Sequence, residues 1–318
     1  MTESIAGHPV PPRLAEGTDP GLIAWRARVP LLVQELLERW TLRAEAPFLP
    51  GGSSAWVAPV RDAAGAEHVL KVAWAHEESR DEAAGMAAWQ GFGAARTHRH
   101  ERRGETVALL LDRVRPGTPL AELLTWPERD EVVAQVARRL WKPPSELVGP
   151  EAAAGFRPLS QMCAWWADEA QQRADEARQR ADDAEQRAET GPSPLPRDLV
   201  EHGLRLFREL PAHWDGEAVL LATDLHPGNV LAASGGRWVL IDPKPYVGDP
   251  HYDVLQHMFN DPDRLRTRPG AFAERMAALA GLDPHRLRRW LFARCVQEAG
   301  ELDAAAEAAL RLAEEGVE

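Results

Sequence analysis

The sequence predicts an α+β protein of two lobes, a small and mostly antiparallel β lobe followed by a larger, mainly helical lobe. Short β-like apolar runs cluster between residues 55 and 111, whereas helical periodicity dominates beyond residue 120. A chain of 318 residues is also too long for one small core. We expect an N-lobe of residues 1–114 and a C-lobe of residues 115–318, with a hinge at Asp112–Arg115.

The composition excludes several classes of protein. Apolar residues make up 44% and charged residues 27% of the chain, as in globular proteins that fold in water. No segment approaches the roughly 20 apolar residues that span a bilayer, and the N-terminus does not resemble a secretory signal. Cys163 and Cys295 have no partner at metal-ligand spacing, so we expect a reduced, cytoplasmic protein without disulfides.

The formal net charge of −12 predicts that the chain binds neither nucleic acid nor anionic membranes, because both would repel it. Residues 168–189 carry eight acids and four arginines, a net of −4, and residues 296–318 carry seven acids and one arginine, a net of −6. A cationic ligand and solvated helix faces both explain such segments, and solvated faces are the more common case.

In the N-lobe, Asp19 and Pro20 predict a helix start, with the aspartate as N-cap and the proline at the first helical position. Apolar residues at helical spacing continue this helix to Leu36, and Pro30 predicts a kink or break within it. We also expect strands at 55–60, 68–74 and 107–111, a turn at 62–65 and a helix at 78–90.

The C-lobe pattern predicts mainly helices. The expected elements are a helix over 120–140 with a break at Trp126–Pro127, a long helix over 159–189 that ends at Gly191–Pro194, a helix over 198–211, strands at 219–221, 230–232 and 238–241, and helices that start at Pro269 and Pro284. Asp283 is the expected N-cap of the last of these, and Gly235–Gly236 predicts a turn between the last two strands.

Small side chains follow one side of the long predicted helix. They recur at alternating steps of four and three residues: Ala170, Ala174, Ala177, Ala181, Ala184 and Ala188. Such a seam lets a second helix approach closely. That helix can be an antiparallel neighbour in the same chain, which is the simpler explanation, or it can belong to a second copy. Monomer and homodimer therefore both stay open.

Three polar residues near the predicted strands carry the chemical signal. Asp224 lies in a loop after a strand, Asn229 starts the next strand, and Asp242 ends the third. A hairpin would bring the ends that carry Asn229 and Asp242 side by side. An amide oxygen and a carboxylate suit Mg²⁺, which prefers oxygen ligands and takes the others from phosphate and water. A further carboxylate can accept the proton of a substrate hydroxyl, so the set predicts phosphoryl transfer.

Three motifs carry a resemblance to a known family. They are Asp-Leu-His-Pro-Gly-Asn-Val-Leu at Asp224–Leu231, Ile-Asp-Pro-Lys at Ile241–Lys244, and Val-Gly-Asp-Pro-His-Tyr-Asp at Val247–Asp253. Together they resemble the aminoglycoside phosphotransferase family, and within it the streptomycin and hydroxyurea kinases. The resemblance covers the chain from about residue 10 to residue 300. It implies a bilobal protein-kinase-like fold, ATP and Mg²⁺ as cofactors, Asp224 as the catalytic residue, and Asn229 and Asp242 as metal ligands.

The resemblance also implies a nucleotide site in the N-lobe. The residues implied are Gly51, Gly52, Ser53 and Ser54 in a loop over the phosphates, Lys71 on a strand, Glu82 on the next helix, and the hinge residues Asp112, Arg113 and Val114 beside the adenine. Lys71 is expected to contact the α- and β-phosphates and to pair with Glu82, for which Asp81 is the alternative. Because hinge contacts are made by the backbone, GTP is not excluded.

One position departs from the family pattern, which has His-x-Asp where this chain has Ala222-Thr223-Asp224. In the resembled fold that histidine supports the loop, so its loss affects loop geometry more than the chemistry. We interpret His226 as loop-supporting. The resemblance implies that Asp253 holds the loop through backbone hydrogen bonds, with a helix N-cap as the alternative. Asp249 is a possible cap with no catalytic role, and Lys244 either meets phosphate or pairs with an acid.

The resemblance also implies that the acceptor sits over the catalytic loop, between helices whose acidic residues pair with cationic groups of the ligand. Glu298, Glu301 and Asp303 are the candidates for this wall. We therefore expect a kinase for a hydroxyl of a small molecule, foremost an antibiotic that it inactivates to give resistance. A kinase for a sugar, amino alcohol or nucleoside is the alternative. A non-catalytic ATP-binding module is a third hypothesis, supported only by Ala222.

Overall fold

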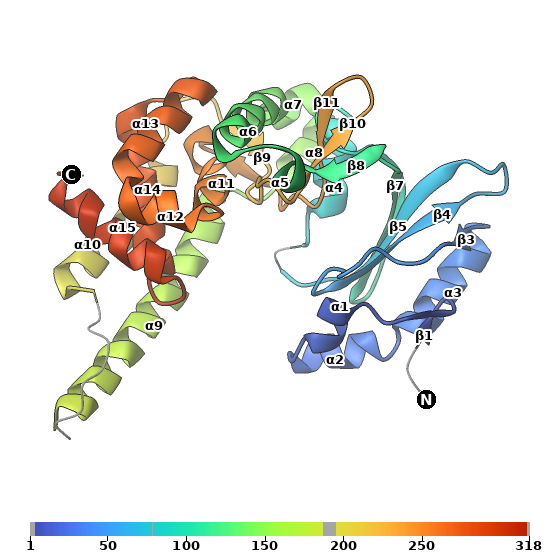
Figure 1. Cartoon of the computed structure of the whole chain (residues 1–318), viewed down its shortest axis with the longest axis horizontal. Helices are drawn as coiled ribbons and strands as arrows, with labels where there is room; N and C mark the ends of the chain where they lie inside the picture. The colour runs from blue at the N-terminus through green and yellow to red at the C-terminus, as the bar shows by residue number, and fades with distance from the viewer. Residues whose placement is uncertain (1–3, 78, 187–194, 317–318) are drawn as a thin grey trace. The chain divides into compact units, whose positions relative to one another are not determined.

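The computed structural model describes residues 4–77, 79–186 and 195–316, which form two compact units (Figure 1). The first unit contains the chain up to Thr118 together with Leu231–Lys244, and the second contains Pro119–Val230 and the chain from Pro245 onward. The first unit therefore includes a short segment from the second half of the sequence. The expected helix end at Gly191–Pro194, the seam residue Ala188 and the side chain of Ala184 lie outside the described part, as does Glu78.

The first unit is built on a five-stranded antiparallel sheet in the order β3-β4-β5-β7-β6. Its strands are β3 (Arg43–Ala44), β4 (Ala55–Arg61), β5 (Glu67–Trp74), β6 (Thr97–Arg103) and β7 (Thr106–Asp112). β4, β5 and β7 confirm the three expected strands. Lys71 lies opposite Val57 of β4 and Leu109 of β7, in the middle of the sheet.

Strand β6 was not predicted from the sequence. Its residues, Thr-His-Arg-His-Glu-Arg-Arg, are exposed or half-buried and show no apolar alternation. Backbone pairing with the buried strand β7 forms it instead, with a register shift between Thr97 and Arg99. Charged side chains at a sheet edge also discourage pairing with another chain.

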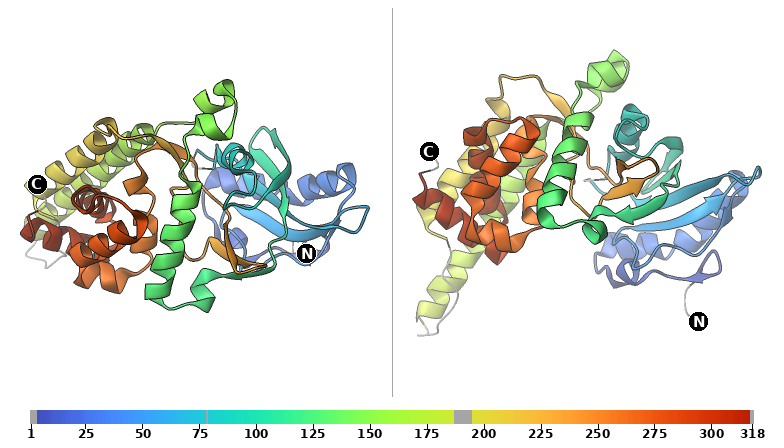
Figure 2. Two further views of the ribbon diagram at one scale, coloured as in Figure 1. Left: turned by 90° about the horizontal axis from the view of Figure 1, so that it is seen from above. Right: turned by 45° about the horizontal axis from the view of Figure 1, so that its top comes forward.

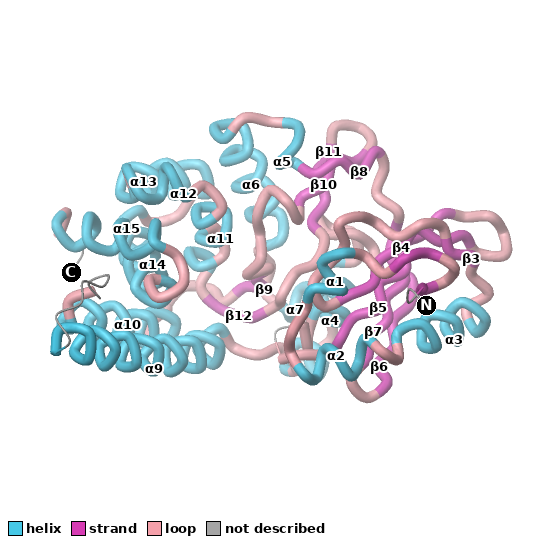
Figure 3. Tube along the Cα trace, turned by 60° about the horizontal axis from the view of Figure 1, so that its bottom comes forward, coloured by secondary structure: helices cyan, strands magenta, loops and turns pink. Residues whose placement is uncertain are grey.

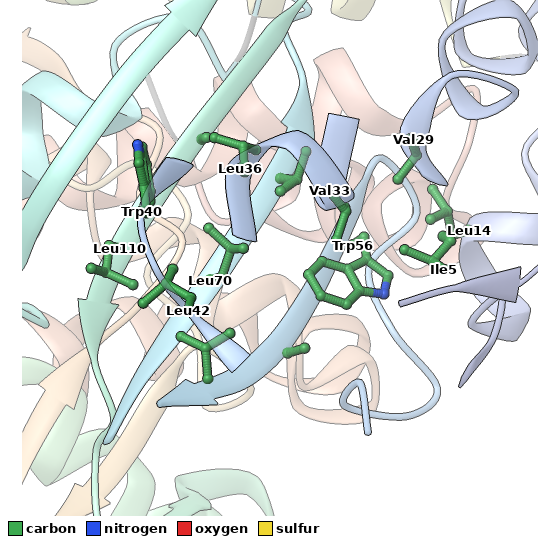
Figure 4. Close-up of a cluster of buried hydrophobic side chains, with 14 of the residues drawn as sticks. Ile5, Leu14, Val29, Val33, Leu36, Trp40, Leu42, Trp56, Leu70 and Leu110 are labelled. Atoms are coloured by element: carbon green, nitrogen blue, oxygen red, sulfur yellow. The ribbon is translucent and has the colours of Figure 1, made fainter. Parts of the chain in front are cut away.

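Three helices contribute with the sheet to the apolar core of the first unit, and a two-stranded hairpin precedes them. These elements are β1 (Ser4–Ile5), β2 (His8–Pro9), α1 (Pro12–Glu16), α2 (Pro20–Arg26) and α3 (Val29–Arg39). Figure 4 shows side chains of α3 and the strands in one cluster, with Val33 and Leu36 beside Trp56, Leu70 and Leu110. The buried face of α3 thus fixes the helix on the sheet through the hydrophobic effect.

The predicted start and break of the N-terminal helix are confirmed. The carboxylate of Asp19 accepts hydrogen bonds from the backbone N–H groups of Gly21 and Leu22, so it caps α2. The break falls between Arg26 and Val29, and Pro30 lies in the first turn of α3, where its missing N–H costs no helical bond. Helix α4 (Glu82–Trp89) begins at Glu82 rather than at residue 78 as expected, and it packs against β6.

A small sheet in the order β11-β10-β8 combines a hairpin of β10 and β11 with a strand from much earlier in the chain, β8 (Figure 2). Its strands are β8 (Pro116–Pro119), β10 (Val230–Ala233) and β11 (Arg237–Leu240). Gly235 and Gly236 make the predicted turn with positive φ angles. The end of β11 is tied to the segment after α4, because Leu240 N–H donates to Gly93 O (2.7 Å) and Leu240 O accepts from Ala95 N–H (2.9 Å).

The second unit is mainly helical. Its helices are α5 (Leu120–Leu123), α6 (Trp126–Leu140), α7 (Pro144–Leu147), α8 (Pro150–Ala154), α9 (Leu159–Gln186), α10 (Arg197–Ala212), α11 (Leu255–Phe259), α12 (Pro262–Thr267), α13 (Pro269–Ala280), α14 (Pro284–Glu298) and α15 (Asp303–Glu314), with the 3₁₀ helix η1 (Pro250–Tyr252). The break expected at Trp126–Pro127 lies just before it, at Leu124 and Thr125, and Trp126 begins α6. The helix starts at Pro269 and at Pro284, with Asp283 as N-cap, are confirmed.

Helix α9 has its expected neighbour within the same chain. It packs against α10, and α10 also packs against α14 (Figure 3). Ala170, the first residue of the alanine seam, is buried. Within the described residues, no helix combines the length and the apolar character needed to cross a membrane.

Two short strands lead to and from the motifs of the second unit. They are β9 (Val219–Leu221), which matches the expected strand, and β12 (Tyr246–Gly248), which was not predicted. They pair antiparallel, with Leu221 opposite Tyr246. The end of β9 therefore lies beside the start of β12, and the chain after β12 returns through η1 to place Asp253 within hydrogen-bond distance of Ala222 and Thr223, just before Asp224.

Candidate active site

In the first unit, two carboxylates share the ammonium group of Lys71. Its Nζ lies 2.6 Å from Oε1 of Glu82 and 2.7 Å from Oδ1 of Asp242. Glu82 reaches the lysine because it is the first residue of α4, whereas Asp81 is the N-cap of that helix. Of the two partners that the sequence left open, the structure therefore pairs Lys71 with Glu82.

The three charges differ in burial. Lys71 and Glu82 are buried, while the side chain of Asp242 is 46% exposed. Burial alone would lower the pKa of Lys71, but the charges of Asp242 and Glu82 raise it above its ordinary value. The lysine is thus a fixed cation with one accessible carboxylate beside it. Asp242 has a φ of 52°, which is uncommon for a residue with a side chain and often marks a functional position.

The Gly51–Ser54 loop lies between β3 and β4 in the chain. Gly51 has a φ of 89°, and a Cβ there would lie 2.5 Å from Cβ of Pro11, so this position requires glycine. Ser54 O accepts a hydrogen bond from Trp74 N–H (2.8 Å), which anchors the end of the loop to β5. Gly52 and Ser53 lie just before this anchor, in the loop that leads into β4, the strand paired with the Lys71 strand β5.

The expected hinge residues follow β7. His98 Nε2 lies 2.5 Å from Oδ1 of Asp112, and the guanidinium of Arg113 donates to Glu45 (3.1 Å). Residues of the first unit therefore hold these two side chains. Val114 is packed closely by Gly117, where a Cβ would lie 2.6 Å from Val114 O.

In the second unit, Asn229 orients Asp224. Its Nδ2 donates to the backbone O (3.1 Å) and to Oδ2 (3.3 Å) of Asp224. Because the amide nitrogen is used in this way, the amide oxygen of Asn229 is the atom available to a cation. Asp224 itself is half-buried, as suits a carboxylate that must reach a bound hydroxyl.

His226 faces the same carboxylate. The backbone N–H of Gly228 donates to Nδ1 of His226 (3.1 Å), so in the neutral ring the proton is on Nε2. That Nε2 lies 3.7 Å from Oδ1 of Asp224. A Cβ at Gly228 would lie 2.9 Å from Cε1 of His226, so the absence of a side chain lets the ring occupy this place.

Asp253 contacts the backbone just before Asp224. Its Oδ1 accepts from Thr223 N–H (2.6 Å), and its Oδ2 accepts from Ala222 N–H (3.2 Å) and from Nε1 of Trp141 (2.9 Å). The side chain of Asp253 is therefore used for the loop and not as a helix N-cap. Nothing in the local sequence around Trp141 indicated this contact, because the two partners are 112 residues apart.

Asp249 acts as the cap of η1, where its carboxylate accepts from His251 N–H. It also accepts from Arg286 (2.6 Å) and from Nε1 of Trp290 (2.6 Å), both on α14, so it joins η1 to α14. Lys244 belongs to the first unit, near enough to Glu82 for its charge to favour the ionised carboxylate. Both explanations of Lys244 stay open.

Two of the three acids expected in the acceptor wall form ion pairs within the second unit. Glu298 lies 2.8 Å from Arg294, and Glu301 lies 3.3 Å from Arg173. Asp303 is exposed in the first turn of α15. A cationic ligand would have to compete with an arginine at the first two positions.

The donor atoms fit Mg²⁺ better than a transition metal. Among the described residues, no group of three or more His, Cys, Asp or Glu side chains could hold a metal ion. Asp242 in the first unit offers a carboxylate, and Asn229 in the second unit offers an amide oxygen. Mg²⁺ is usually bound by one or two protein oxygens together with phosphate and water, so each of these donors is of the kind that Mg²⁺ prefers.

Comparison with known proteins decides the family. Residues 39–305 match the family model described as aminoglycoside/hydroxyurea antibiotic resistance kinase. The chain belongs to this family. It is therefore a small-molecule kinase, and the predicted resemblance is confirmed.

Two curated relatives cover most of the chain. A streptomycin 6-kinase of Streptomyces glaucescens is 33% identical over 87% of this chain and 83% of its own length. A hydroxyurea phosphotransferase of Kitasatospora aureofaciens is 34% identical over 85% of this chain and 72% of its own length.

Solved structures confirm the kinase-like fold. A choline/ethanolamine kinase family protein from Mesorhizobium loti superposes with a TM-score of 0.55 at 14% identity, covering 92% of this chain and 94% of its own. An amicoumacin kinase in complex with AMP-PNP and Ca²⁺ gives the same TM-score at 13% identity, covering 92% of this chain and 95% of its own. At these identities the likeness supports the fold alone.

Proposed function

We propose that this kinase transfers the γ-phosphoryl group of ATP, with Mg²⁺, to a hydroxyl group of an antibiotic and so inactivates it. The observation that carries the proposal is the Lys71 ammonium between Glu82 and Asp242, in a chain of the antibiotic resistance kinase family. A fixed cation beside an accessible carboxylate suits a triphosphate and its metal ion.

The nucleotide would be bound by residues of the N-lobe, 1–114. Lys71 binds oxygens of the α- and β-phosphates, and Glu82 keeps the ammonium in place. The loop Gly51–Ser54 covers the phosphates, and backbone groups of Asp112–Val114 bind the base. Asp242 and Asn229 each provide an oxygen to Mg²⁺, which when bound offsets the charge of the triphosphate.

The acceptor would be bound by the C-lobe, 115–318. Asp224 aligns the acceptor hydroxyl and takes its proton while the hydroxyl oxygen attacks the γ-phosphorus in line. The bond from the acceptor oxygen to phosphorus forms as the bond to the β-phosphate oxygen breaks, and ADP leaves with that electron pair. Asn229 and His226 keep the carboxylate of Asp224 in the orientation that this step needs.

We propose a cationic acceptor of the streptomycin type, with hydroxyurea as the smaller candidate. The names of the two relatives support these acceptors, and the acidic C-terminal segment supports a cation. Of the three acids expected in the acceptor wall, we assign Asp303 first as the partner of the cationic group, because Glu298 and Glu301 already pair with arginines. We place the reaction in the cytoplasm, where ATP is available; both cysteines are free and buried.

The test is ADP release from Mg·ATP with a panel of acceptors. The panel contains streptomycin, other aminoglycosides, hydroxyurea, nucleoside antibiotics, simple sugars and amino alcohols. Turnover that depends on an antibiotic supports the proposal, and expression in sensitive cells should then protect them. Turnover with a metabolite alone would replace the antibiotic by that metabolite.

The matched variant for this test is Asp224→Asn. It removes the proton acceptor and keeps the size of the side chain. We expect ATP binding within about twofold of wild type and a loss of turnover of at least 10²-fold, the lower range of general base catalysis. Retained turnover would remove Asp224 from its role.

A further inference from the structure

The backbone just before Asp224 makes a strained turn. Asp224 N–H donates to Ala222 O (2.7 Å), which closes a three-residue turn around Thr223. Thr223 has a φ of 49°, where a β-branched residue is a genuine outlier. Such a conformation persists only where the surroundings fix it. The direction of Asp224 therefore depends on the groups that hold Ala222 and Thr223.

Asp253 holds both residues through their N–H groups. Its side chain is fully buried, and it forms no ion pair with any residue in the described ranges of the chain. The carboxylate instead accepts three N–H groups, two from the turn and one from Trp141. A buried carboxylate without a cation depends on each such donor, because every unmade bond leaves desolvation uncompensated.

Trp141 is placed for this contact by the end of α6. Its backbone N–H donates to Ala137 O (3.0 Å), which closes the last helical turn. The backbone O of the next residue, Lys142, accepts a hydrogen bond from Leu220 N–H in β9 (2.9 Å). The segment after α6 is thus tied to the strand that leads into the catalytic loop. The indole N–H reaches Oδ2 of Asp253 from this tethered position.

We propose that Trp141 is a positioning residue of the kinase reaction, which acts through Asp253 to fix the turn that aims Asp224. Ala222 has no polar side-chain group that could support the catalytic loop, and in this chain the indole N–H of Trp141 provides that support through Asp253. The proposal rests on the proposed function, because it takes Asp224 as the residue that aligns the acceptor.

The charge state of Asp253 offers an independent readout. Burial raises its pKa to about 6, while the N–H groups of Trp141, Ala222 and Thr223 act against this rise. The neighbouring Tyr252 does not add a charge, because its burial also raises the pKa of its phenol. Loss of the indole N–H should therefore raise the pKa of Asp253 further. The turn should then loosen, and turnover should fall, at a higher pH than in wild type.

The test compares Trp141→Phe with Trp214→Phe. Both variants lose an indole N–H bond in the second unit, but Trp214 donates to the backbone O of Glu217. For Trp141→Phe we expect kcat about tenfold lower, the effect of one such bond, with KM for Mg·ATP within twofold. The acid limb of the kcat profile should move up by roughly one pH unit. Trp214→Phe should change none of these; an unchanged kcat and pH profile in Trp141→Phe would overturn the proposal.

A second measurement separates this inference from the proposed function. Hydrogen exchange of the Ala222 and Thr223 amides and NMR titration of the Asp253 carboxyl need no acceptor. If wild type turns over no acceptor, the proposed function fails, and these data alone decide the structural role of Trp141. Faster exchange and a raised pKa in Trp141→Phe support it, and unchanged values overturn it. Trp141→His keeps a ring N–H and can replace the phenylalanine variant if that variant does not fold. It should retain part of the exchange protection of the Ala222 and Thr223 amides. A complete loss of this protection would count against the role of the N–H.

Discussion

Nζ of Lys71 lies 2.6 Å from Oε1 of Glu82, and the two partners come from different elements, β5 and α4. Glu82 is buried while Asp242, the second partner of the lysine, is half-exposed. The two carboxylates are therefore not equivalent. Glu82 pairs with Lys71 in the buried interior, whereas the carboxylate of Asp242 stays partly accessible beside the ammonium.

Replacing Glu82 should weaken nucleotide binding. In Glu82→Gln the ammonium of Lys71 keeps only Asp242 as a charged partner, and removing one member of a buried pair typically costs about 3–5 kcal/mol. If part of this cost falls on the bound state, KM for Mg·ATP should rise by about tenfold or more. Steady-state kinetics at varied Mg·ATP measure this rise.

The control is Glu77→Gln, which removes an exposed ion pair with Arg80 (3.7 Å, both side chains 53% exposed) in the same unit. An exposed pair contributes about 0–1 kcal/mol, so KM should stay near the wild-type value. An equal KM in the two variants would mean that the Lys71–Glu82 pair does not serve the nucleotide.

A methyl group at position 228 should displace His226. The Cβ of Gly228→Ala would lie 2.9 Å from Cε1 of the imidazole, and the ring can only move away from it. The ring would then lose its place 3.7 Å from Asp224. Misplacement of a catalytic group by about 1 Å can reduce rates by up to roughly 10²-fold, so we expect kcat to fall by tenfold or more.

Thermal unfolding should show that this effect is local. The loop is accessible at Gly228, so Tm of Gly228→Ala should stay close to wild type. Gly149→Ala is the matched control, because a Cβ there meets nothing within 4 Å. A kcat equal to that of Gly149→Ala would exclude a role for the His226 ring in orienting Asp224.

Local signals in the sequence are strong enough to predict several of these elements. Asp19 with Pro20 and Asp283 with Pro284 each combine a capping side chain with a proline in the first turn, and both start helices. Strand β5 could be predicted because apolar residues flank Lys71. The next helix then brings an acid within reach of that lysine. Whether the acid is residue 81 or 82 depends on where α4 begins, which the sequence leaves ambiguous by several residues.

Contacts between distant segments could not be predicted in this way. β6 consists of polar residues and exists because β7 offers it a backbone ladder. Trp141 and Asp253 are 112 residues apart and meet through the tertiary fold, which no local motif encodes. The burial of a charged side chain could not be predicted either, because the sequence around Asp130 in α6 is that of an ordinary acid on a helix face.

Asp130 should be a main determinant of the stability of the second unit. Its buried carboxylate accepts from His257 (2.7 Å), from both terminal nitrogens of Arg264 (2.7 Å each) and from Arg275 (2.7 Å). These partners lie on α11, α12 and α13, one on each helix. Asp130→Asn removes the charge and turns an NH₂ group toward the donors, so unfolding free energy should fall by about 3–5 kcal/mol. Urea unfolding measures this loss.

Glu131→Gln is the control one residue away. Its carboxylate lies 3.7 Å from Arg275 and is 65% exposed, so stability should change by less than about 0.5 kcal/mol. A similar loss in both variants would indicate an effect of net charge rather than of the buried cluster.

The carboxylate of Asp130 should also make the folded protein less stable at low pH. Burial alone would raise the pKa of Asp130, but hydrogen bonds from Arg264, His257 and Arg275 hold it well below its ordinary value. A lowered folded-state pKa stabilises the fold above the unfolded pKa of about 3.9, and this contribution disappears as the pH falls below that value. Tm of wild type should therefore drop below about pH 4, and the drop should be smaller in Asp130→Asn. Parallel curves for both proteins would contradict the assignment.

Gly203 should mark the closest approach of α10 to α14. A Cβ at this position would lie 2.5 Å from Cγ2 and 2.6 Å from Cβ of Val296, so the helices must separate to accept it. Overpacking costs about 1–3 kcal/mol, and alanine returns up to about 1 kcal/mol of helix propensity, so Gly203→Ala should destabilise by roughly 1–2 kcal/mol. Val296→Ala removes the clashing Cγ atoms and leaves only Cβ, so the double variant should lose less stability than the sum of the two single variants. Additive losses in urea unfolding would show that the alanine is accommodated elsewhere and that this contact does not set the helix spacing.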